Sequence, residues 1–453
     1  MDTIVALSTP QGTGAIGVVR LSGPQAIQMV SGVFKGKNLT EQPANTLHFG
    51  SMVRGGVVLD EVVVALFRAP HSYTKEDVAE ISCHGSPYIL QQVIELLIEQ
   101  GARPAKPGEF TLRAFLNGRM DLSQAEAVAD LIASHSEASH KLAIQQMRGG
   151  FSNRIKELRG KLVHFASMVE LELDFGEEDV EFADRSALET LVNELNDIIT
   201  RLIRSFQLGN VIKTGVSTVI AGRPNSGKST LLNRLLNEER AIVSDTPGTT
   251  RDTIEEAIVI GGILFRLIDT AGIREATDAI EKIGVERTFQ KISQSAIVVY
   301  LFDASTLSPQ LLKHDLSRLK SAEIPVLIVG NKIDALPDRS MLDSFVKEFP
   351  HTVFLSSLTG EGIAGLEQAL IETLAGQGLG IEDTIVSNAR HYDSLLHTQE
   401  ALNAVLAGIA NRTTSDFLAL DIRRGLHHLG EITGEITTDD LLDNIFSKFC
   451  IGK

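Results

Sequence analysis

The spacing of hydrophobic and polar positions changes along the chain. Over about the first 115 residues, apolar residues gather in short runs separated by Gly and Pro, which predicts strands joined by turns. From about residue 120 they recur at every third or fourth position, as on one face of a helix. Short apolar runs return from about residue 214 to 374, and helical spacing then follows again. The pattern predicts an α+β unit followed by helices that an α/β unit interrupts.

The first unit contains several short runs typical of strands and one typical of a helix. We expect strands at Thr3–Leu7, Ile16–Leu21, Val62–Phe67 and Val78–Ser82, and a helix at Tyr88–Glu99. This mixture predicts a separate α+β domain at the N-terminal side.

Gly12, Gly14 and Gly17 match the dinucleotide fingerprint G-x-G-x-x-G by letter. The residues that follow, Val18-Val-Arg-Leu21, are typical of a strand, whereas the fingerprint needs a helix N-terminus to hold the pyrophosphate. A tight turn between two strands is therefore favoured over a dinucleotide site.

Apolar stripes at helical spacing flank the α/β unit. Before it they comprise Ile155, Leu158, Leu162, Phe165 and Val169, and then Leu188, Leu191, Leu195, Ile198 and Leu202. After it they comprise Tyr392, Leu395, Leu402, Val405, Phe417 and Leu420. Between the first two stripes, the acidic segment Glu177–Glu181 matches no calcium loop, so a solvated turn is favoured over a metal site.

Glycines near the end of the α/β unit, Gly376-Gln-Gly-Leu-Gly380, are typical of a hinge. We therefore predict domains at 1–117, 118–213, 214–375 and 376–453, the second and fourth being parts of one all-α helical domain. Insertion of an α/β domain between two helix ends is physically easy when the inserted domain's termini lie close together.

Composition narrows the classes of protein. With 43% apolar and 22% charged residues, the chain is ordinary for a globular protein, and extensive disorder is not expected. No apolar run is long enough to span a membrane, and residues 1–5 lack a targeting pattern, so we expect a cytoplasmic protein without a membrane partner. Cys83 and Cys450 are too far apart in sequence to indicate a disulfide framework. A net charge of −16 predicts that any RNA contact uses a local patch or a second protein.

The stretch Gly222-Arg-Pro-Asn-Ser-Gly-Lys-Ser229 fits the phosphate-binding P-loop G-x-x-x-x-G-K-[ST]. An apolar run, Val216–Ala221, precedes it, and helical spacing at Leu231, Leu232 and Leu235 follows, which is the strand–loop–helix setting that phosphate binding needs. A glycine-rich turn before a core helix is the alternative. The predicted nucleotide contacts in this stretch are Asn225, Ser226, Gly227, Lys228, Ser229 and Thr230, with Ser229 on Mg²⁺.

Further motifs follow in the order that a GTPase requires. In Gly248-Thr-Thr-Arg-Asp252, Thr250 is expected to complete the Mg²⁺ shell and sense the γ-phosphate. The strand expected at Ile263–Ile268 leads into Asp269-Thr-Ala-Gly272, where Asp269 can hold Mg²⁺ through water and the Gly272 N–H can meet the γ-phosphate. Thr270 and Ala271 complete that predicted contact set.

The base-reading motif is Gly330-Asn-Lys-Ile-Asp334, after the apolar run Val326–Val329. A buried Asp334 carboxylate can accept from N1–H and the exocyclic amine of guanine, whereas ATP would leave it unpaired. This motif argues against a P-loop kinase or ATPase. Asn331, Lys332 and Asp334 are therefore predicted to bind nucleotide, and Ser356, Ser357 and Leu358, after the expected strand Val353–Leu355, to close over the base. Together the motifs predict a guanine-nucleotide domain with ligands at its strand ends.

The position after Asp-Thr-Ala-Gly is Ile273, where Ras carries the glutamine that orients the attacking water. An isoleucine cannot orient or deprotonate water. No arginine finger is evident, although Arg251, Arg274 and Arg287 are available. Hydrolysis therefore needs another water-positioning group and another positive charge.

The chain as a whole resembles the MnmE (TrmE) family of tRNA modification GTPases. The resemblance runs from Asp2-Thr-Ile-Val-Ala6, through Gly-Thr-Thr-Arg-Asp252, to Phe449-Cys-Ile-Gly-Lys453. A Cys-a-a-X prenylation box has a similar outline, but Gly and Lys fit its last positions poorly. The resemblance implies an α/β P-loop GTPase domain inserted into an all-α helical domain, preceded by an α+β folate-binding-like domain that dimerises.

The resemblance also implies an activity and its partners. With a flavin-dependent partner of the MnmG (GidA) type, in a heterotetramer or larger assembly, the homodimer would add an aminomethyl or carboxymethylaminomethyl group to C5 of the wobble uridine of certain tRNAs. The one-carbon unit would come from 5-formyl- or methylene-tetrahydrofolate. Glycine and ammonium both stay open as the nitrogen donor.

Site residues can be carried over by the same resemblance. Folate contacts fall on Arg20, Glu80, Arg119 and Lys453. Cys450 would lie near them, either reacting or only shaping the pocket. A potassium ion would replace the arginine finger, with ligands from Asn225, Ser244, Thr246 and Thr249, of which Ser244 and Thr249 would also contact nucleotide. Glu281 would orient the water, so that Glu281, Thr250 and Gly272 form the expected catalytic set.

A regulatory ribosome-assembly GTPase that binds RNA without covalent chemistry is the alternative function. It predicts a basic RNA-binding appendage such as a KH module with G-x-x-G. Outside the GTPase domain that spacing falls at Gly14-Ala-Ile-Gly17, which carries no basic residue. The modification GTPase is therefore favoured.

Overall fold

The computed structural model describes residues 2–174, 185–238, 255–269, 295–319, 324–375 and 385–452. The chain forms two compact units, each described by itself here. One comprises residues 1–129, 146–192 and 400–453, and the other comprises 130–145 and 193–399. The predicted acidic turn at 177–181 and the predicted hinge at 376–380 lie outside the described residues. The domain boundaries at 117, 213 and 375 stay predictions.

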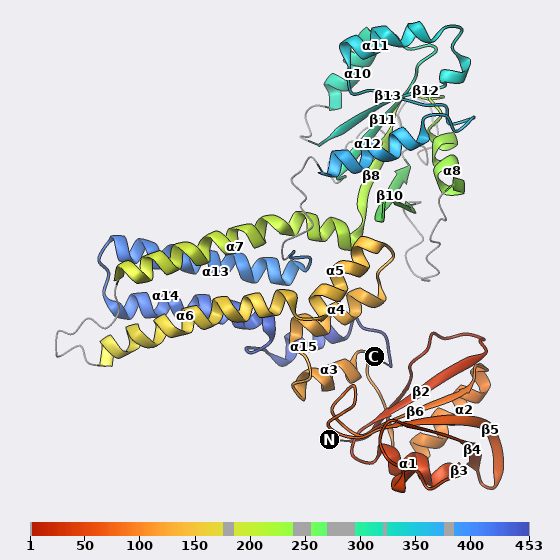
Figure 1. Cartoon of the computed structure of the whole chain (residues 1–453), viewed down its shortest axis with the longest axis vertical. Coiled ribbons are helices and arrows are strands. Elements are labelled where there is room, and N and C mark those ends of the chain that lie inside the picture. The colour runs from red at the N-terminus through yellow and green to blue at the C-terminus, as the bar shows by residue number, and fades with distance from the viewer. Residues whose placement is uncertain are drawn as a thin grey trace, which may run out of the picture. The chain divides into compact units, whose positions relative to one another are not determined.

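The first unit begins with a seven-stranded sheet in residues 4–104, all of which the structure describes (Figure 1). Its spatial order is β3-β4-β5-β6-β2-β1-β7, and every neighbouring pair is antiparallel except β1 with β7. The strands are β1 Ile4–Leu7, β2 Ile16–Ser22, β3 Phe34–Lys35, β4 Thr46–Arg54, β5 Val57–Phe67, β6 Val78–His84 and β7 Arg103–Pro104. All four predicted strands are present, whereas β4 and the first half of β5 were not predicted.

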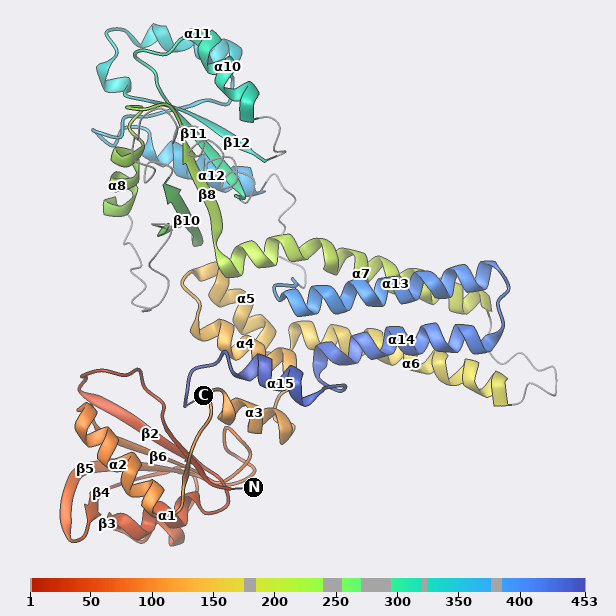
Figure 2. The ribbon, with the colours of Figure 1, turned by 180° about the vertical axis from the view of Figure 1, so that it is seen from behind.

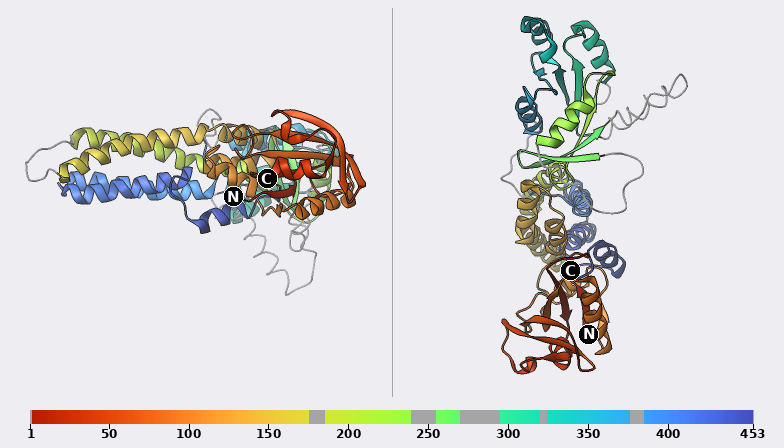
Figure 3. Two further views of the ribbon diagram at one scale, coloured as in Figure 1. Left: turned by 90° about the horizontal axis from the view of Figure 1, so that it is seen from below. Right: turned by 90° about the vertical axis from the view of Figure 1, so that its right-hand side faces the viewer.

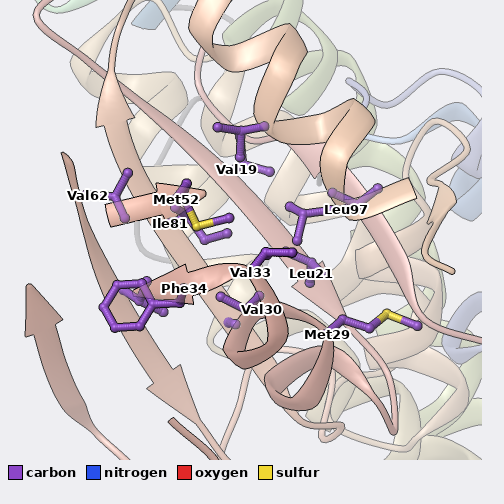
Figure 4. Packing of buried hydrophobic residues seen from close by; sticks show 14 of the residues in the cluster. Val19, Leu21, Met29, Val30, Val33, Phe34, Met52, Val62, Ile81 and Leu97 are labelled. Carbon is purple, nitrogen blue, oxygen red and sulfur yellow. The ribbon is translucent and has the colours of Figure 1, made fainter. Parts of the chain in front are cut away.

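Two helices cover one face of this sheet, α1 (Ala26–Val33) and α2 (Pro87–Glu99) (Figure 2). The predicted helix 88–99 is thus confirmed. Alternate residues of the strands pack against the helices in the core that Figure 4 shows, including Val19, Leu21 and Ile81. Full burial of such side chains stabilises the fold by about 1.5–3 kcal/mol each. The other face is covered at β1, where Ile4 and Ala6 pack with Phe110, and open at β4, where Leu47 and Phe49 are exposed.

The glycine segment 12–17 lies between two antiparallel strands, β1 and β2, and no helix follows it. Gly17 already belongs to β2, where a Cβ would stand 2.6 Å from the Leu90 side chain. The predicted turn is confirmed, and the dinucleotide alternative has no helix N-terminus to use.

The helices of the first unit pack in the register of their apolar stripes. They are α3 Glu109–Leu116, α4 Leu122–Ile132, α6 Gly150–Asp174, α14 Ser415–Thr433 and α15 Asp439–Phe446. α6 and α14, yellow and blue in Figures 1 and 3, lie side by side. The predicted stripe of α6 is buried at Ile155, Leu158, Leu162 and Val169, and half-buried at Phe165.

One predicted helix face is wrong. Phe417 and Leu420 of α14 are 59% and 55% exposed, whereas Leu418, Ile422 and Leu429 are buried. Helical spacing fits both sets, so spacing alone does not decide which face is buried, and the packing of α14 against α6 decides it.

The helix α7 (Arg185–Thr214) shows a smaller difference of the same kind. Leu188, Leu195 and Leu202 are buried as predicted. Between them Val192 and Ile199 are buried, whereas the predicted Leu191 and Ile198 are only half-buried. The α13 helix (Ala389–Ala410) buries Leu395, Leu402 and Val405 as predicted.

The second unit contains an α/β domain. In the described residues its sheet has the order β13-β12-β11-β8-β10-β9, parallel except for β9. The strands are β8 Val216–Ala221, β9 Glu255–Ile260, β10 Ile263–Asp269, β11 Ile297–Asp303, β12 Val326–Asn331 and β13 Val353–Phe354. The helices are α8 Lys228–Glu238, α10 Pro309–Leu319, α11 Asp343–Glu348 and α12 Ile363–Ala375. Short 3₁₀ turns, η4 and η5, lie at Ile333–Ala335 and Arg339–Leu342.

Helices cover both faces of this sheet (Figure 1). α8 and α12 pack on one face, and α10 and α11 pack on the other. Helical segments precede and follow the α/β domain in the chain. The predicted fold class, an α/β domain inserted into an all-α one behind an α+β domain, is confirmed. Among the described residues, no helix combines the length and apolarity that crossing a membrane requires.

Candidate functional site

The P-loop leaves β8 and enters α8 through two glycines that no other residue can replace. At Gly222 (φ +153°) a Cβ would lie 2.0 Å from the Leu301 carbonyl oxygen. At Gly227 (φ +95°) it would lie 2.2 Å from Asn331 Nδ2. Between them Asn225 adopts a left-handed φ of 61°, which asparagine tolerates better than most side chains. The loop therefore has the tight path that cradles phosphate at a helix N-terminus.

Lys228 already lies over this loop. Its Nζ donates to the carbonyls of Gly222 and Arg223, at 3.0 Å each. The hydroxyls of Ser229 and Thr230, in the first turn of α8, are on exposed residues. A lysine cation and a helix N-terminus at one point suit the phosphates of a nucleotide.

Asn331, at the end of β12, joins the P-loop to the loop at 356–358. Its Nδ2 donates to the Ser226 carbonyl at 2.8 Å. Its Oδ1 accepts from the Ser357 N–H at 2.9 Å and from the Ser357 hydroxyl at 3.0 Å. Asn331, Ser226, Ser356 and Ser357 are all buried, so these bonds are shielded from water. The predicted phosphate and base loops are thus brought together.

Ser226 also has a buried hydroxyl that finds no hydrogen-bond partner among the described residues. An orphaned polar atom next to a loop with two forced glycines fits a site built around a polar ligand.

The base-reading motif differs in one respect from the prediction. Lys332 adopts a left-handed φ of 65°, and its Nζ pairs with Asp303 Oδ2 at 2.8 Å. Asp334, in the 3₁₀ turn η4, is exposed rather than buried. The strand β12 ends at Asn331, so the turn projects beyond the sheet. Selection by Asp334 therefore depends on shielding that a bound base would itself supply.

Arg223, the second P-loop residue, is tied to α10. Its Nε and Nη2 reach the two carboxylate oxygens of Asp315 at 2.6 and 3.0 Å. Tyr300 donates its hydroxyl to the same carboxylate at 2.6 Å. The hydrogen bond from Arg223, together with that from Tyr300, lowers the pKa of Asp315 against the opposing effect of burial. The bidentate ion pair with Asp315 occupies the Arg223 guanidinium, so Arg223 stabilises the P-loop.

Several predicted site residues cannot be placed. Asp269 ends β10 beside Ile220 of β8, but its side chain is outside the described part of the structure. The remaining ones lie outside the described residues altogether: Ser244, Thr246, Thr249, Thr250, Thr270, Ala271, Gly272, Glu281 and Lys453. Magnesium would be held by Ser229 with Asp269 and Thr250, and hydroxyl and carboxylate oxygens are the ligands it prefers.

A second group of predicted residues meets on the face of the N-terminal sheet that lies opposite α1 and α2. Arg20 of β2 stands directly opposite Glu80 of β6 in the strand register. Arg20 Nε and Nη2 both contact Glu80 Oε1 at 2.8 Å. These contacts leave Oε2 able to accept a hydrogen bond from a ligand.

Tyr73 lies between the two predicted cations. The Arg20 guanidinium is 5.6 Å from the centre of the Tyr73 ring, and the Arg119 guanidinium is 5.4 Å from it. Phe110 lies 5.7 Å from Arg20 in the same way. Tyr73 is fixed by a 2.9 Å hydrogen bond to Thr111, and Arg119 by one to the Ser72 carbonyl. Arg20, Glu80 and Arg119 are thus brought around an aromatic side chain.

The segment 450–452 reaches the same place. The Gly452 carbonyl accepts from Arg20 Nη1 at 3.4 Å and from the Ser8 hydroxyl at 3.3 Å. The Cys450 carbonyl accepts from the Gly108 N–H at 3.4 Å, and Cys450 itself is exposed. At Gly452 (φ +94°) a Cβ would lie 2.1 Å from the Leu7 carbonyl oxygen. Phe446 and Phe449 hold this segment by packing with Leu122.

Sequence reasoning did not find Tyr73, Phe110, Ser8, Asp303 or Asp315. Each comes from a segment far in sequence from the motif that it supports, and none has a characteristic spacing. Such partner residues are recognised only in the folded structure, where the distant segments come together.

Comparisons with known proteins agree over the whole chain. Residues 3–119 match the family model described as the GTP-binding protein TrmE N-terminus, and residues 122–450 match that of the MnmE helical domain. A protein of Cytophaga hutchinsonii, named tRNA modification GTPase MnmE, is 59% identical over 100% of this chain and 98% of its own length. One of the same name from Christiangramia forsetii is 52% identical over 100% of this chain and 99% of its own length.

Among solved structures, Era of Aquifex aeolicus bound to GDP·AlF₄⁻ is 25% identical. The likeness covers 41% of this chain and 66% of that chain, with a TM-score of 0.29. The family models and full-length relatives decide the assignment: the chain belongs to the MnmE (TrmE) family of tRNA modification GTPases.

Proposed function

We propose that this chain is a potassium-stimulated GTPase that modifies C5 of the wobble uridine of certain tRNAs together with a flavin-dependent partner of the MnmG (GidA) type. An aminomethyl or carboxymethylaminomethyl group would be added, with tetrahydrofolate supplying the one-carbon unit. The observation that carries the nucleotide part is Asn331, which bonds to the P-loop and to the base loop at once. One buried side chain thereby fixes the distance between phosphate and base contacts.

Most of the proposed nucleotide contacts fall on described residues. Lys228 and the α8 N–H groups would hold the β- and γ-phosphates, and Ser229 would hold Mg²⁺. Bound Mg²⁺ would offset the charge that develops on the phosphate oxygens. Asp334 would read the guanine edge, while Ser356, Ser357 and Leu358 close over the base. Asn225 would be one ligand of potassium, with Ser244, Thr246 and Thr249, and Glu281 would orient the water.

The folate part is supported by the residues that meet around Tyr73. A tetrahydrofolate carries a flat ring with N–H donors and a carboxylate-bearing tail. Glu80 Oε2 can accept from the ring, Arg119 and Lys453 can pair with carboxylates, and Tyr73 and Phe110 offer apolar surface. Arg20 contacts both Glu80 and the 450–452 segment, so this segment would border the proposed folate site. Cys450, the first residue of the segment, is exposed.

A homodimer is supported by the open face of the N-terminal sheet. Phe49 of β4 pairs with Val63 of β5, and Leu47 pairs with Ala65. Phe49 is 69% exposed, Leu47 71% and Val63 36%. Contiguous exposed apolar side chains on a sheet face are unusual on a monomer and mark interaction surfaces. A second copy of the chain is the proposed occupant.

Nucleoside analysis of tRNA tests the proposal as a whole. In cells that lack this protein, wobble uridines of the substrate tRNAs should be unmodified at C5. The wild-type gene should restore the modification, and Lys228→Ala should not. Lys347→Ala, an exposed lysine on α11, is the matched control and should restore it fully. Unchanged wobble uridines in the deletion strain would overturn the proposal.

A further inference from the structure

The side chain of Arg234 joins the helix after the P-loop to the loop expected to close over guanine. Its Nε donates to the Ser357 carbonyl at 3.3 Å, and its Nη2 donates to the Leu358 carbonyl. Arg234 lies less than two turns beyond Lys228 in α8. One short helix therefore contacts the phosphate loop at its start and the base loop further along.

These contacts fix the direction of main-chain donors. In a planar trans peptide, the C=O and the N–H of one unit point in opposite directions. The Ser357 carbonyl belongs to the same peptide unit as the Leu358 N–H, and the Leu358 carbonyl to the same unit as the Thr359 N–H. The latter donates to Ser356 Oγ at 3.1 Å. Two successive peptide units thus have a set orientation.

The loop is held from two sides. Asn331 accepts from the Ser357 N–H and hydroxyl, whereas Arg234 donates to the carbonyls of Ser357 and Leu358. The Leu358 side chain is 71% exposed, so apolar packing of that side chain contributes little to the placement. Polar contacts therefore decide where the loop stands.

We propose that Arg234 is a positioning residue for guanine recognition, acting by aiming the Leu358 N–H at the C6 carbonyl of the base. This inference rests on the proposed guanine site. Guanine presents an acceptor at C6 and adenine presents an amine, so a donor fixed there favours guanine. Arginine suits the role because its planar fork donates to two carbonyls at once, which a lysine ammonium does not do in a fixed geometry.

Dissociation of a fluorescent GDP analogue from the full-length protein, followed by stopped flow, tests this role. Arg234→Ala should release the nucleotide about tenfold faster, since the charge-assisted hydrogen bonds that hold the loop are lost. Arg234→Lys should give an intermediate rate. Asn233→Ala, an exposed neighbour on α8, is the matched control and should match wild type.

A base analogue separates positioning from general damage to the fold. The diphosphate of 2-aminopurine riboside keeps the exocyclic amine but has no carbonyl at C6. Arg234→Ala should lower the preference for GDP over this analogue about tenfold, while affinity for the analogue stays at the wild-type value. An equal loss for both nucleotides, or no change in GDP release, would overturn the inference. If wild type does not prefer GDP to ADP, the guanine site itself is wrong, and the inference falls with it.

Discussion

Asn331 shows how one side chain can set two loops. Its amide donates to the P-loop and accepts from Ser357, and it is 1% exposed. The sequence motif predicted that Asn331 lies at the end of a strand. Its hydrogen bonds also depend on Gly227, because the missing Cβ there leaves room for Asn331 Nδ2. At this scale the chemistry of the nucleotide site was predictable, because each motif residue acts through its own functional group.

Nucleotide choice should depend on one exposed carboxylate. Asp334→Asn is expected to erase the preference for GTP over ATP, which should be about a hundredfold in wild type, because a charge-assisted pair with the guanine edge is lost. Asp338→Asn is the control, since Asp338 lies on the surface and only caps η5. Competition titrations with both nucleotides measure the ratio, and a wild-type protein that binds ATP as well would contradict the assignment.

The proposed folate contacts were less predictable at the residue scale. The resemblance gave Arg20, Glu80 and Arg119, but not Tyr73, which lies between both arginines. A lone tyrosine in a turn-rich segment has no hydrophobic periodicity that would identify it as a site residue.

The environment of Cys83 was likewise not predicted from the sequence. Burial raises the pKa of its thiol to about 12, and the nearby Asp60 raises it further. The partners of such residues come from other strands and helices.

At the scale of elements, periodicity predicted the type of each long segment better than its buried face. The predicted buried face of α6 was correct. On α14, however, the structure buries Leu418 and Ile422 and leaves Phe417 exposed. An apolar residue on either side of a helix gives the same spacing, and the neighbouring helix decides which one it covers. The strand β4 was missed because Gly50 and Ser51 interrupt its apolar alternation.

Ion pairs tie β1, β7 and α3 together, and their strength should depend on pH. Hydrogen bonding to Arg103 holds the pKa of Asp2 well below its usual value, against the effect of burial. Burial raises the pKa of Glu109, but hydrogen bonds from Arg103, the Lys106 N–H and Arg113 outweigh it and keep that pKa low. Groups with a lowered pKa stabilise the folded state above their ordinary pKa, and this contribution is lost as pH falls.

Local stability around β1 should therefore fall as pH drops below about 4.3, the ordinary pKa of a glutamate. Arg103→Met should weaken this pH dependence, because both carboxylates lose a partner. Hydrogen exchange of residues 2–7, corrected for the intrinsic rate at each pH, measures the effect. Arg54→Met, which breaks an exposed pair with Glu99, is the control. The same pH dependence in Arg103→Met and wild type would refute the role of this network.

The 450–452 segment should matter for folate and not for GTP. Deletion of residues 450–453 is expected to weaken 5-formyl-tetrahydrofolate binding by about tenfold or more, because charge-assisted contacts at Arg20 and Lys453 are lost. Titration calorimetry on the full chain and on the deletion variant compares the two affinities. GTP affinity, measured on the same samples, serves as the control. Equal folate affinities would show that the site is wrongly assigned.

For the whole molecule, a net charge of −16 is consistent with tRNA contacts that are local or made by a partner. The order of units along the chain was predictable from the changes in periodicity. The extents of the units were less predictable, because the compact units divide within the long helices α7 and α13, at residues 192 and 399. Helical spacing continues through such a division without any change.

The open sheet face should decide the oligomeric state. Phe49→Glu is expected to convert a dimer to a monomer, because a stable interface buries about 800 Å² on each partner and does not tolerate an unpaired charge at its centre. Met341→Glu, which changes an exposed apolar side chain of the α/β domain, is the control. Light scattering coupled to size exclusion measures the mass. A dimeric Phe49→Glu protein would rule out this face.

Potassium should accelerate GTP turnover strongly and sodium poorly. An arginine finger is worth about 10³–10⁵ in rate, and a cation held by Asn225 and residues 244–249 is proposed in its place. A smaller ion would leave part of that oxygen cage slack. Turnover in matched potassium and sodium buffers measures the effect, and Glu281→Ala should lose hydrolysis but keep GTP binding. Equal rates in the two salts would exclude the cation, and an active Glu281→Ala would exclude that residue.

The contact between Arg20 and Gly452 also sets the stage of protein synthesis at which this part of the structure can be completed. The two residues are 432 positions apart, and a ribosome adds about 5–20 residues per second, so the second follows the first by roughly 20–90 s. During that interval the N-terminal sheet can fold, but the 450–452 segment has not yet been synthesised. The contact of Arg20 with this segment is therefore absent from every shorter nascent chain.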